Sequence, residues 1–404
     1  MTRHTNSLYN FFMKSFKIAR LPYLIFGQGR LETLTVLLKE QSWKKVILFT
    51  GSGSFRTSNW GNSLLDSLKT GGIKFTHYFI SGEPSPELVD RIAEENRQDR
   101  PDACISVGGG SVIDTGKAVS AMLKASGSIE DYLEGVGTRK PTGKKLPFIA
   151  VPTTSGTGAE ATKNAVISRV GENGFKKSFR HDNYVPDFAV IDPELILSCP
   201  PDISAYSGLD AITQLVEAFV SSTANPFTDA LVRSALHHAG KSFPRAVRDG
   251  ERDLQARADM AYSAYISGIA LANAGLGVVH GIAGALGGLF PVPHGVVCGT
   301  LIGAATDRII ERLFENPSAN KEAIEKYAEA GRILGGSTED SASKDCALLV
   351  RVLNGWINEF KVPRLSAYGI DTQAVGLIAA KSGIKNTPLE LDKEDIKEIL
   401  KARL

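Results

Sequence analysis

Cysteine is scarce in this chain, with four residues among 404. They lie far apart and form no CxxC pair, so the sequence shows neither a disulfide framework nor a zinc ribbon. Thiols used this sparingly are typical of proteins in a reducing compartment, and we therefore expect a cytoplasmic location. The four positions are Cys104, Cys199, Cys298 and Cys346.

An excess of charge is also missing, since the formal net charge is only +2. A protein with so little net charge has no strong electrostatic attraction for nucleic acid or an anionic membrane surface, and we expect neither as a partner. The start of the chain lacks an apolar core of signal-peptide length, and residues 1–20 are expected to form an N-terminal leader. Residues 266–292 are fairly apolar, but their glycines and prolines favour buried helices over a membrane span.

A chain of 404 residues exceeds the usual size of one hydrophobic core, so two domains are expected. Strand-like runs at 46–50, 74–80 and 103–107 alternate with helical patterns at 62–72 and 85–98. This alternation predicts an α/β domain with a Rossmann-like, doubly wound parallel sheet.

Beyond Pro193 the strand signal fades and helical periodicity takes over. We place a domain boundary there, which gives an α/β domain at 21–192 and an all-helical domain at 193–404. Helices are expected at 204–222, 226–240, 252–272, 276–287, 295–312, 320–334, 341–360 and 388–402.

The glycine-rich segment 108–117, GGGSVIDTGK, directly follows a predicted strand. Glycines allow close approach of the backbone to a ligand, and a helix start offers free N–H groups to phosphate. Ser111 and Asp114 also fit a capping box, a structural role that is compatible with phosphate binding. Neither of the common nucleotide-binding glycine patterns is present.

A second polar loop, VPTTSGTGAEAT, follows the strand that ends at Pro152. Its hydroxyl groups suit a ribose, a pyrophosphate or a carboxamide, although a turn with a helix cap explains them equally well. Two such loops at the ends of neighbouring strands favour one extended ligand. Further strands are expected at 164–170 and 187–192, with Lys176 and Lys177 between them in a solvated loop or at a ligand.

One carboxylate and two imidazoles are candidates for a metal site. Asp210 and Gln214 share a helical face, whereas His280 and His294 are separated by glycine and proline breaks. An acid and two histidines from separate helices suit a divalent metal with an open coordination position. Satisfied core histidines are the structural alternative. Cys298 could face the same pocket, but core packing explains it more simply.

Several of these motifs resemble those of the iron-containing (group III) alcohol dehydrogenases, within the dehydroquinate synthase-like superfamily. The matching stretches are GGGSVIDTGK, VPTTSGTGAE, AVIDPELILSCPPDISAYSGLDAITQLVE, NAGLGVVHG and PHG, in the family's order. The resemblance covers nearly the whole chain, from about residue 20 to 400. It implies hydride transfer between a nicotinamide cofactor and a small alcohol or aldehyde, at a metal between the two domains. Homodimers are common among similar proteins.

By resemblance, Asp210, His280 and His294 match metal ligands and act in catalysis, with iron or zinc as the metal. Gln214 stands where the family has its other ligand histidine, and Gly284 replaces a further conserved histidine. Gln214 offers a neutral oxygen, which is a weaker ligand for these metals than an imidazole. These departures leave two alternatives. The site could hold a metal with three protein ligands and a water, as in similar glycerol dehydrogenases, or it could have lost its metal, as in maleylacetate reductases.

The resemblance also implies the contacts of a dinucleotide. Small residues in place of an acid after the first strand leave room for a 2′-phosphate, which favours NADP over NAD. These residues are Gly51, Ser52 and Ser54. The pyrophosphate end is assigned to Gly108, Gly109, Gly110, Ser111 and Asp114. The nicotinamide ribose side is assigned to Thr153, Thr154, Thr157, Asn164 and Lys177.

Three other functions stay open at this point. A metal-independent reductase of oxo acids, of the maleylacetate type, would need no residues that bind a metal. A lyase similar to dehydroquinate synthase would use NAD only transiently. A non-catalytic nucleotide-binding protein would explain the replaced histidines. The sequence does not identify the substrate.

Overall fold

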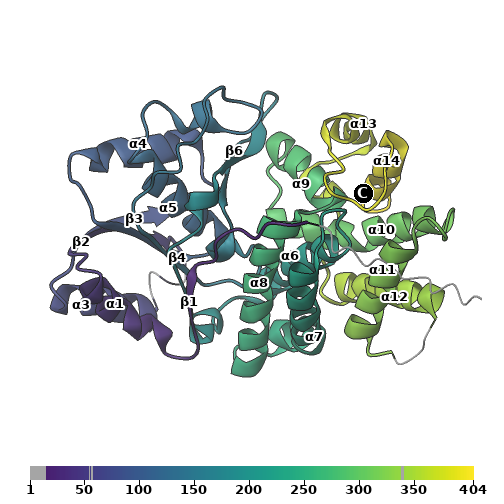
Figure 1. The fold of residues 1–404 in the computed structure, drawn as a ribbon, viewed down its shortest axis with the longest axis horizontal. Helices are drawn as coiled ribbons and strands as arrows, with labels where there is room; N and C mark the ends of the chain where they lie inside the picture. The colour runs from purple at the N-terminus through teal and green to yellow at the C-terminus, as the bar shows by residue number, and fades with distance from the viewer. Residues whose placement is uncertain (1–14, 54, 56–57, 338–340) are drawn as a thin grey trace, which may run out of the picture.

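A computed structural model describes residues 15–53, 55, 58–337 and 341–404. Figure 1 shows an α/β half at the left, built on a sheet, and a helical half at the right. The sheet has six parallel strands in the order β1-β8-β5-β4-β2-β3. This confirms the predicted doubly wound parallel sheet followed by a helical part. The strands are β1 (Tyr23–Phe26), β2 (Lys45–Gly51), β3 (Lys74–Ile80), β4 (Ala103–Gly108), β5 (Phe148–Pro152) and β8 (Phe188–Ile191).

Alternation of side chains along the strands builds a core on each face of the sheet. Strand β2 sends Val46 and Leu48 into one core and Ile47 and Phe49 into the other. The first core includes leucines of α1 (Thr33–Glu40) and α3 (Asn59–Thr70). The second includes residues of α4 (Pro86–Arg97) and α5 (Gly110–Met122). The central strands are thereby covered on both sides.

Two further strands form a separate antiparallel hairpin, β6 (Asn164–Arg169) and β7 (Phe175–Arg180). The strand predicted at 164–170 is therefore present, but it lies outside the parallel sheet. The solvated loop that was one alternative for Lys176 and Lys177 is not present, because both residues belong to β7. The second polar loop contains only one short helical element, the 3-10 turn η3 (Ala159–Ala161).

The helical half begins with the 3-10 turn η5 (Pro193–Ile196), directly after the last strand of the sheet. The boundary at 193 falls at this change and stays a prediction. All eight predicted helices are present, and α13 was not predicted. Their bounds are α6 (Pro201–Phe219), α7 (Pro226–Arg248), α8 (Leu254–Ala274), α9 (Val278–Leu289), α10 (His294–Phe314), α11 (Lys321–Gly335), α12 (Ala342–Glu359), α13 (Thr372–Lys381) and α14 (Lys393–Lys401).

Helix α7 continues well beyond the end that was predicted at residue 240. Its extension contains Pro244, which normally interrupts a helix by removing a backbone hydrogen bond. Phe243, Ala246 and Val247 of this last part are buried in the helical core. Burial of these side chains outweighs the cost of the proline, and no local signal in the sequence shows that contact.

The end of the predicted leader contacts the rest of the chain. The backbone N–H of Ala19 donates to Oδ1 of Asn273 at 2.6 Å, and Arg20 pairs with Asp187 at 2.9 Å. Residues 1–14 of the leader lie outside the described residues.

No single helix in the described part of the chain is long and apolar enough to cross a membrane. Helices α8 and α9 meet that test only when taken together, and they are bent by 96° where they meet.

Candidate active site

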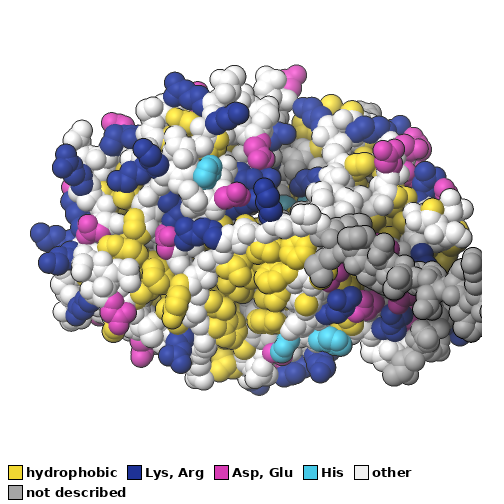
Figure 2. Space-filling model, viewed as in Figure 1, with side chains coloured by type: hydrophobic (Ala, Val, Ile, Leu, Met, Phe, Trp, Pro, Cys, Tyr) yellow, Lys and Arg dark blue, Asp and Glu magenta, His cyan; other side chains and the backbone are white. Residues whose placement is uncertain are grey.

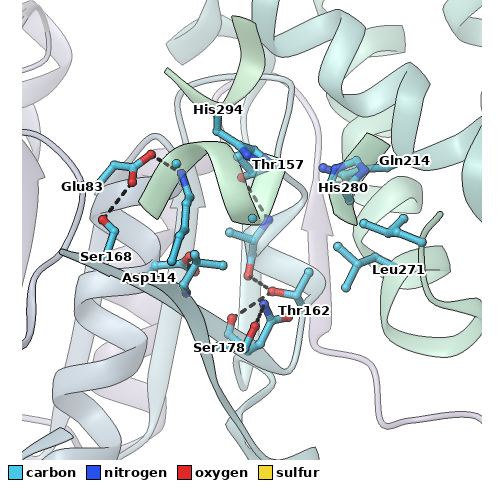
Figure 3. Close-up of a pocket in the computed structure, with 18 of the residues that line it drawn as sticks. Glu83, Asp114, Thr157, Thr162, Ser168, Ser178, Gln214, Leu271, His280 and His294 are labelled. Atoms are coloured by element: carbon cyan, nitrogen blue, oxygen red, sulfur yellow. Dashed lines mark hydrogen bonds and ion pairs between the residues drawn. The ribbon is translucent and has the colours of Figure 1, made fainter. Parts of the chain in front are cut away.

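A cavity of about 1240 Å³ lies between the α/β half and the helical half. Small-molecule pockets usually measure about 300–1,000 Å³, so this one suits an extended ligand. Figure 2 shows a hollow between the two halves, with Lys and Arg side chains near its mouth. Figure 3 shows Glu83, Asp114 and Ser168 on the α/β side of the cavity, across from His280 and Gln214 of the helical half.

Four potential metal-binding atoms converge at the helical side of this cavity. Asp210 lies in α6, His280 in α9, and His294 and Cys298 in the first turns of α10. Their ligand atoms all lie within 4.8 Å of one another. Oδ1 of Asp210 is 3.3 Å from Nε2 of His280 and 3.7 Å from Nε2 of His294. The two histidines and the acid predicted from the sequence are thus brought together.

Asp210 is buried, with 1% of its surface exposed, and its Oδ1 has no hydrogen-bond partner among the described residues. Burial alone would raise the pKa of this carboxyl group, but His294 and His280 beside it lower the pKa to about 2. Asp210 is therefore held as an anion in a region poor in water. A buried, unpartnered carboxylate oxygen facing two imidazoles fits a divalent cation.

Glu217 fixes the orientation of His280. Its Oε2 lies 2.6 Å from Nδ1 of the histidine, and its Oε1 accepts from the backbone N–H of Val279 at 2.7 Å. With a carboxylate on Nδ1, the neutral ring keeps its proton at that nitrogen, so Nε2, which faces Asp210, can offer its lone pair to a cation. This arrangement is common for histidines that bind metals.

Gln214 is the predicted ligand that is least committed to the cluster. It is buried and lines the cavity. Its Oε1, however, lies 3.0 Å from the hydroxyl of Ser267 in α8, which donates to it. The amide oxygen is therefore engaged by a neighbouring helix.

The glycine-rich loop forms the opposite wall. Gly109 precedes α5 without any side-chain cap, so the first N–H groups of the helix are available to an anion. A Cβ atom on Gly110 would lie 2.7 Å from the side chain of Thr157, so only glycine fits there. The predicted capping box of Ser111 and Asp114 is wrong. Asp114 instead accepts from the backbone N–H of Val166 at 2.9 Å and so ties α5 to β6.

A buried lysine holds the second polar loop in place. Nζ of Lys117 donates to the carbonyls of Ala159, Thr162 and Asn164 and to the hydroxyl of Thr162, at 2.7–3.0 Å. Burial lowers the pKa of Lys117 to about 8, partly offset by the nearby Asp114. This cation fixes the path of the loop between β5 and β6, which carries Thr157 to the cavity.

The remaining predicted cofactor residues divide into two groups. Those that line the cavity are Gly110, Ser111, Asp114, Thr157 and Asn164. Those that the described lining does not include are Gly51, Ser52, Gly108, Gly109, Thr153, Thr154 and Lys177. Ser54 lies outside the described residues.

Lys177 is exposed, whereas its neighbour Lys176 faces the cavity and pairs with Glu83. Successive side chains along a strand point to opposite faces of the sheet, so these two lysines of β7 point in opposite directions. The family resemblance pointed to Lys177, and only the strand assignment shows that Lys176 is the lysine that faces the cavity.

Three residues of the site were missed or set aside in the sequence. Glu217 lies seven residues after Asp210 on one helix, a spacing that returns to the same face and could have been noticed. Cys298 is one turn after His294. Lys176 could be recognised as a cavity residue only once its segment was known to be a strand.

Gly284, where the family has a histidine, also lines the cavity. No described atom lies within 4 Å of the position that its Cβ would occupy. The replaced histidine therefore leaves open space in the cavity.

Comparison with known proteins matches nearly the whole chain to one family. A family model described as iron-containing alcohol dehydrogenase matches residues 22–193, and a model of the family's C-terminal part matches residues 204–404. Alcohol dehydrogenase 4 of Saccharomyces cerevisiae strain YJM789 is 32% identical over 94% of this chain and 96% of its own length. The NADPH-dependent butanol dehydrogenase of Clostridium saccharobutylicum is 32% identical over 93% of this chain and 95% of its own.

The fold matches as well. A crystal structure of a mutant alcohol dehydrogenase from a halo-thermophilic archaeon of a Red Sea brine pool superposes with a TM-score of 0.87 at 26% identity, covering 97% of this chain and all of the other. Sequence motifs, fold and site therefore agree. The chain is an oxidoreductase that belongs to the iron-containing alcohol dehydrogenase family.

Proposed function

We propose that this protein transfers hydride between a nicotinamide cofactor and the carbon of a small alcohol or aldehyde, with one divalent metal held by Asp210, His280 and His294. The observation that carries the proposal is the unpartnered Oδ1 of Asp210 facing both imidazoles. Both of these histidines line the same cavity as the start of α5. Such a metal would serve as a Lewis acid toward the substrate oxygen.

The chain's own residues position the reactants. The uncapped start of α5 suits the pyrophosphate. Thr157 and Asn164 line the cavity on the way to the metal ligands and suit the nicotinamide ribose. Enclosure between the two halves would hold the nicotinamide against the substrate carbon and exclude bulk water.

We favour NADP over NAD. Strand β2 ends at Gly51 and is followed by Ser52, so no carboxylate stands at this end of the strand to repel a 2′-phosphate. A Cβ on Gly51 would meet only a methyl group of Val112, at 4.0 Å.

A homodimer and a cytoplasmic location complete the proposal. The edge strand β1 carries exposed apolar side chains, with Tyr23 68% exposed. Figure 2 shows hydrophobic side chains gathered on this face, over the region where Figure 1 places β1. Such a patch supports a protein contact. All four cysteines are free and buried, in keeping with a reducing compartment.

Elemental analysis of the purified protein, beside Asp210→Ala and His280→Ala, tests the proposal. We expect about one zinc or iron per chain in the parent, loss of the metal in both variants, and NADP-linked turnover of small alcohols and aldehydes. Activity that survives chelation would instead favour a metal-independent oxo-acid reductase. A lyase similar to dehydroquinate synthase would turn over without net reduction of the nucleotide. Tight binding of cofactor without turnover of any alcohol, aldehyde or ketone would indicate a non-catalytic nucleotide-binding protein.

A further inference from the structure

We propose that Cys298 is a fourth metal ligand, whose thiolate compensates for the imidazole that the chain lacks at Gln214. The inference rests on the proposed function, because it concerns the same metal site. It assigns the centre an oxygen, two nitrogens and a sulfur as donors, from Asp210, His280, His294 and Cys298.

The four distances that join the sulfur and the carboxylate oxygen to the two imidazole nitrogens are close to those of a tetrahedral zinc shell. Sγ of Cys298 lies 3.6 Å from Nε2 of His280 and 3.6 Å from Nε2 of His294. With the usual bond lengths of zinc, a tetrahedron sets nitrogen and sulfur ligands about 3.6 Å apart and nitrogen and oxygen ligands about 3.3 Å apart. The oxygen of Asp210 is 3.3 Å from one imidazole nitrogen and 3.7 Å from the other.

The surroundings of Cys298 differ from those of a cysteine that only fills a core. Cys298 is completely buried, and one turn of α10 places it on the same side as His294. Its sulfur faces two nitrogen atoms and the unpartnered oxygen of Asp210. Buried Cys346, by contrast, directs its sulfur to the backbone carbonyl of Ile324 at 3.5 Å.

Gln214 is the rival for the fourth position. The Ser267 hydroxyl has one proton and two acceptors within reach, the carbonyl of Ala264 at 2.8 Å and Oε1 of Gln214 at 3.0 Å. If the proton goes to Ala264, the amide of Gln214 can turn, donate to Ser267 and release its oxygen toward the metal. The geometry favours Cys298, because its sulfur already lies at ligand spacing from both histidines.

A thiolate in the ligand set has a consequence for metal choice. Thiolate is a soft ligand, and a tetrahedral set that combines it with imidazoles suits zinc better than the octahedral sites of harder ions. Zinc is therefore the metal expected in this member of a family named for iron. Four protein ligands also mean that substrate oxygen would enter as a fifth, an expansion that catalytic zinc sites allow.

X-ray absorption at the zinc edge of the full-length, zinc-loaded protein tests the inference independently of activity. The parent should show one sulfur neighbour at about 2.3 Å beside nitrogen and oxygen neighbours at about 2.0–2.1 Å. Cys298→Ser should lose the sulfur neighbour. Gln214→Leu, which removes the rival candidate for the fourth ligand, should keep the sulfur neighbour. Circular dichroism of each variant checks that the fold is kept.

Bound zinc without a sulfur neighbour in the parent would overturn the inference and leave the proposed function intact. Persistence of the sulfur signal in Cys298→Ser would overturn it as well. If Cys298→Ser fails to fold, the spectra of the parent and of Gln214→Leu still show whether a sulfur atom binds the zinc. A protein that binds no zinc even after reconstitution would overturn both this inference and the metal in the proposed function.

Discussion

Replacing Glu217 by glutamine should weaken metal binding, although the two side chains have nearly the same shape. In the parent, one carboxylate oxygen accepts from Nδ1 of His280 at 2.6 Å and the other accepts from the N–H of Val279 at 2.7 Å. Both partners are donors. A glutamine has only one acceptor oxygen and cannot satisfy them together.

Each orientation of the new amide carries a cost. If its oxygen faces His280, its NH₂ group meets the N–H of Val279, and a buried donor left without an acceptor costs about 1–3 kcal/mol. If its oxygen faces Val279, the NH₂ group donates to Nδ1 of His280. The ring proton then moves to Nε2, the atom that faces Asp210 and that would bind the proposed metal. Loss of such a carboxylate partner typically costs about 10–100-fold in metal affinity, which is about 1.4–2.8 kcal/mol.

Competition between the protein and a chromophoric zinc chelator measures the effect. We expect the zinc dissociation constant of Glu217→Gln to rise about 10–100-fold. Glu134→Gln is the matched control, because Glu134 lines the cavity and its carboxylate pairs with Arg180 at 3.4 Å instead of with a histidine of the cluster. A dissociation constant of Glu217→Gln within twofold of the parent, with the fold intact, would refute the role assigned to Glu217.

Three further changes test other parts of the site. Gly51→Asp should raise the KM for NADPH relative to NADH at least about tenfold, since a carboxylate beside a 2′-phosphate is repelled; equal changes for both cofactors would argue against the proposed position of the phosphate. Lys117→Met should lower the free energy of unfolding in denaturant by about 3–5 kcal/mol, because it removes a buried cation bonded to four acceptor atoms; an unchanged midpoint would mean that the loop is held by other contacts. Gly284→His should change the free energy of unfolding by less than about 0.5 kcal/mol, because the site is open space on a helix; a marked loss would show that the cavity wall is closed in solution.

The α/β half was predictable because its signals are local. Strand β2 is a short apolar run in the sequence. Helix α4 is preceded by Ser85, whose hydroxyl accepts a hydrogen bond from the N–H of Leu88, as a helix cap does. The hairpin of β6 and β7 was harder, since its alternation is weak and its charged residues resemble a loop. Only the pairing of the strands shows that Lys176 and not Lys177 faces the cavity.

The candidate metal site shows where sequence reasoning ends. Asp210, His280 and His294 could be named from residue type and family resemblance, because each stands alone in an apolar stretch. Their common point of convergence depends on how α6, α9 and α10 pack, which no spacing reveals. The same is true of Gln214, which shares a helical face with Asp210 yet is engaged by Ser267 of a third helix.

The two departures from the family pattern have different physical consequences in this fold. At Gly284 a side chain is removed and nothing fills the space, so the cavity becomes larger and loses a group able to carry protons. At Gln214 a polar side chain remains, but its oxygen accepts a hydrogen bond from Ser267 of α8. The thiol of Cys298, in contrast, lies 3.6 Å from Nε2 of each histidine, the spacing expected between two ligands of one zinc ion. A site that loses one ligand keeps its metal only if another donor completes the shell or water does. Because Cys298 is already buried beside Asp210, the cost of desolvating it is met during folding, and binding a cation there relieves the unpartnered carboxylate as well. We therefore expect the chain to retain a metal with a changed ligand set.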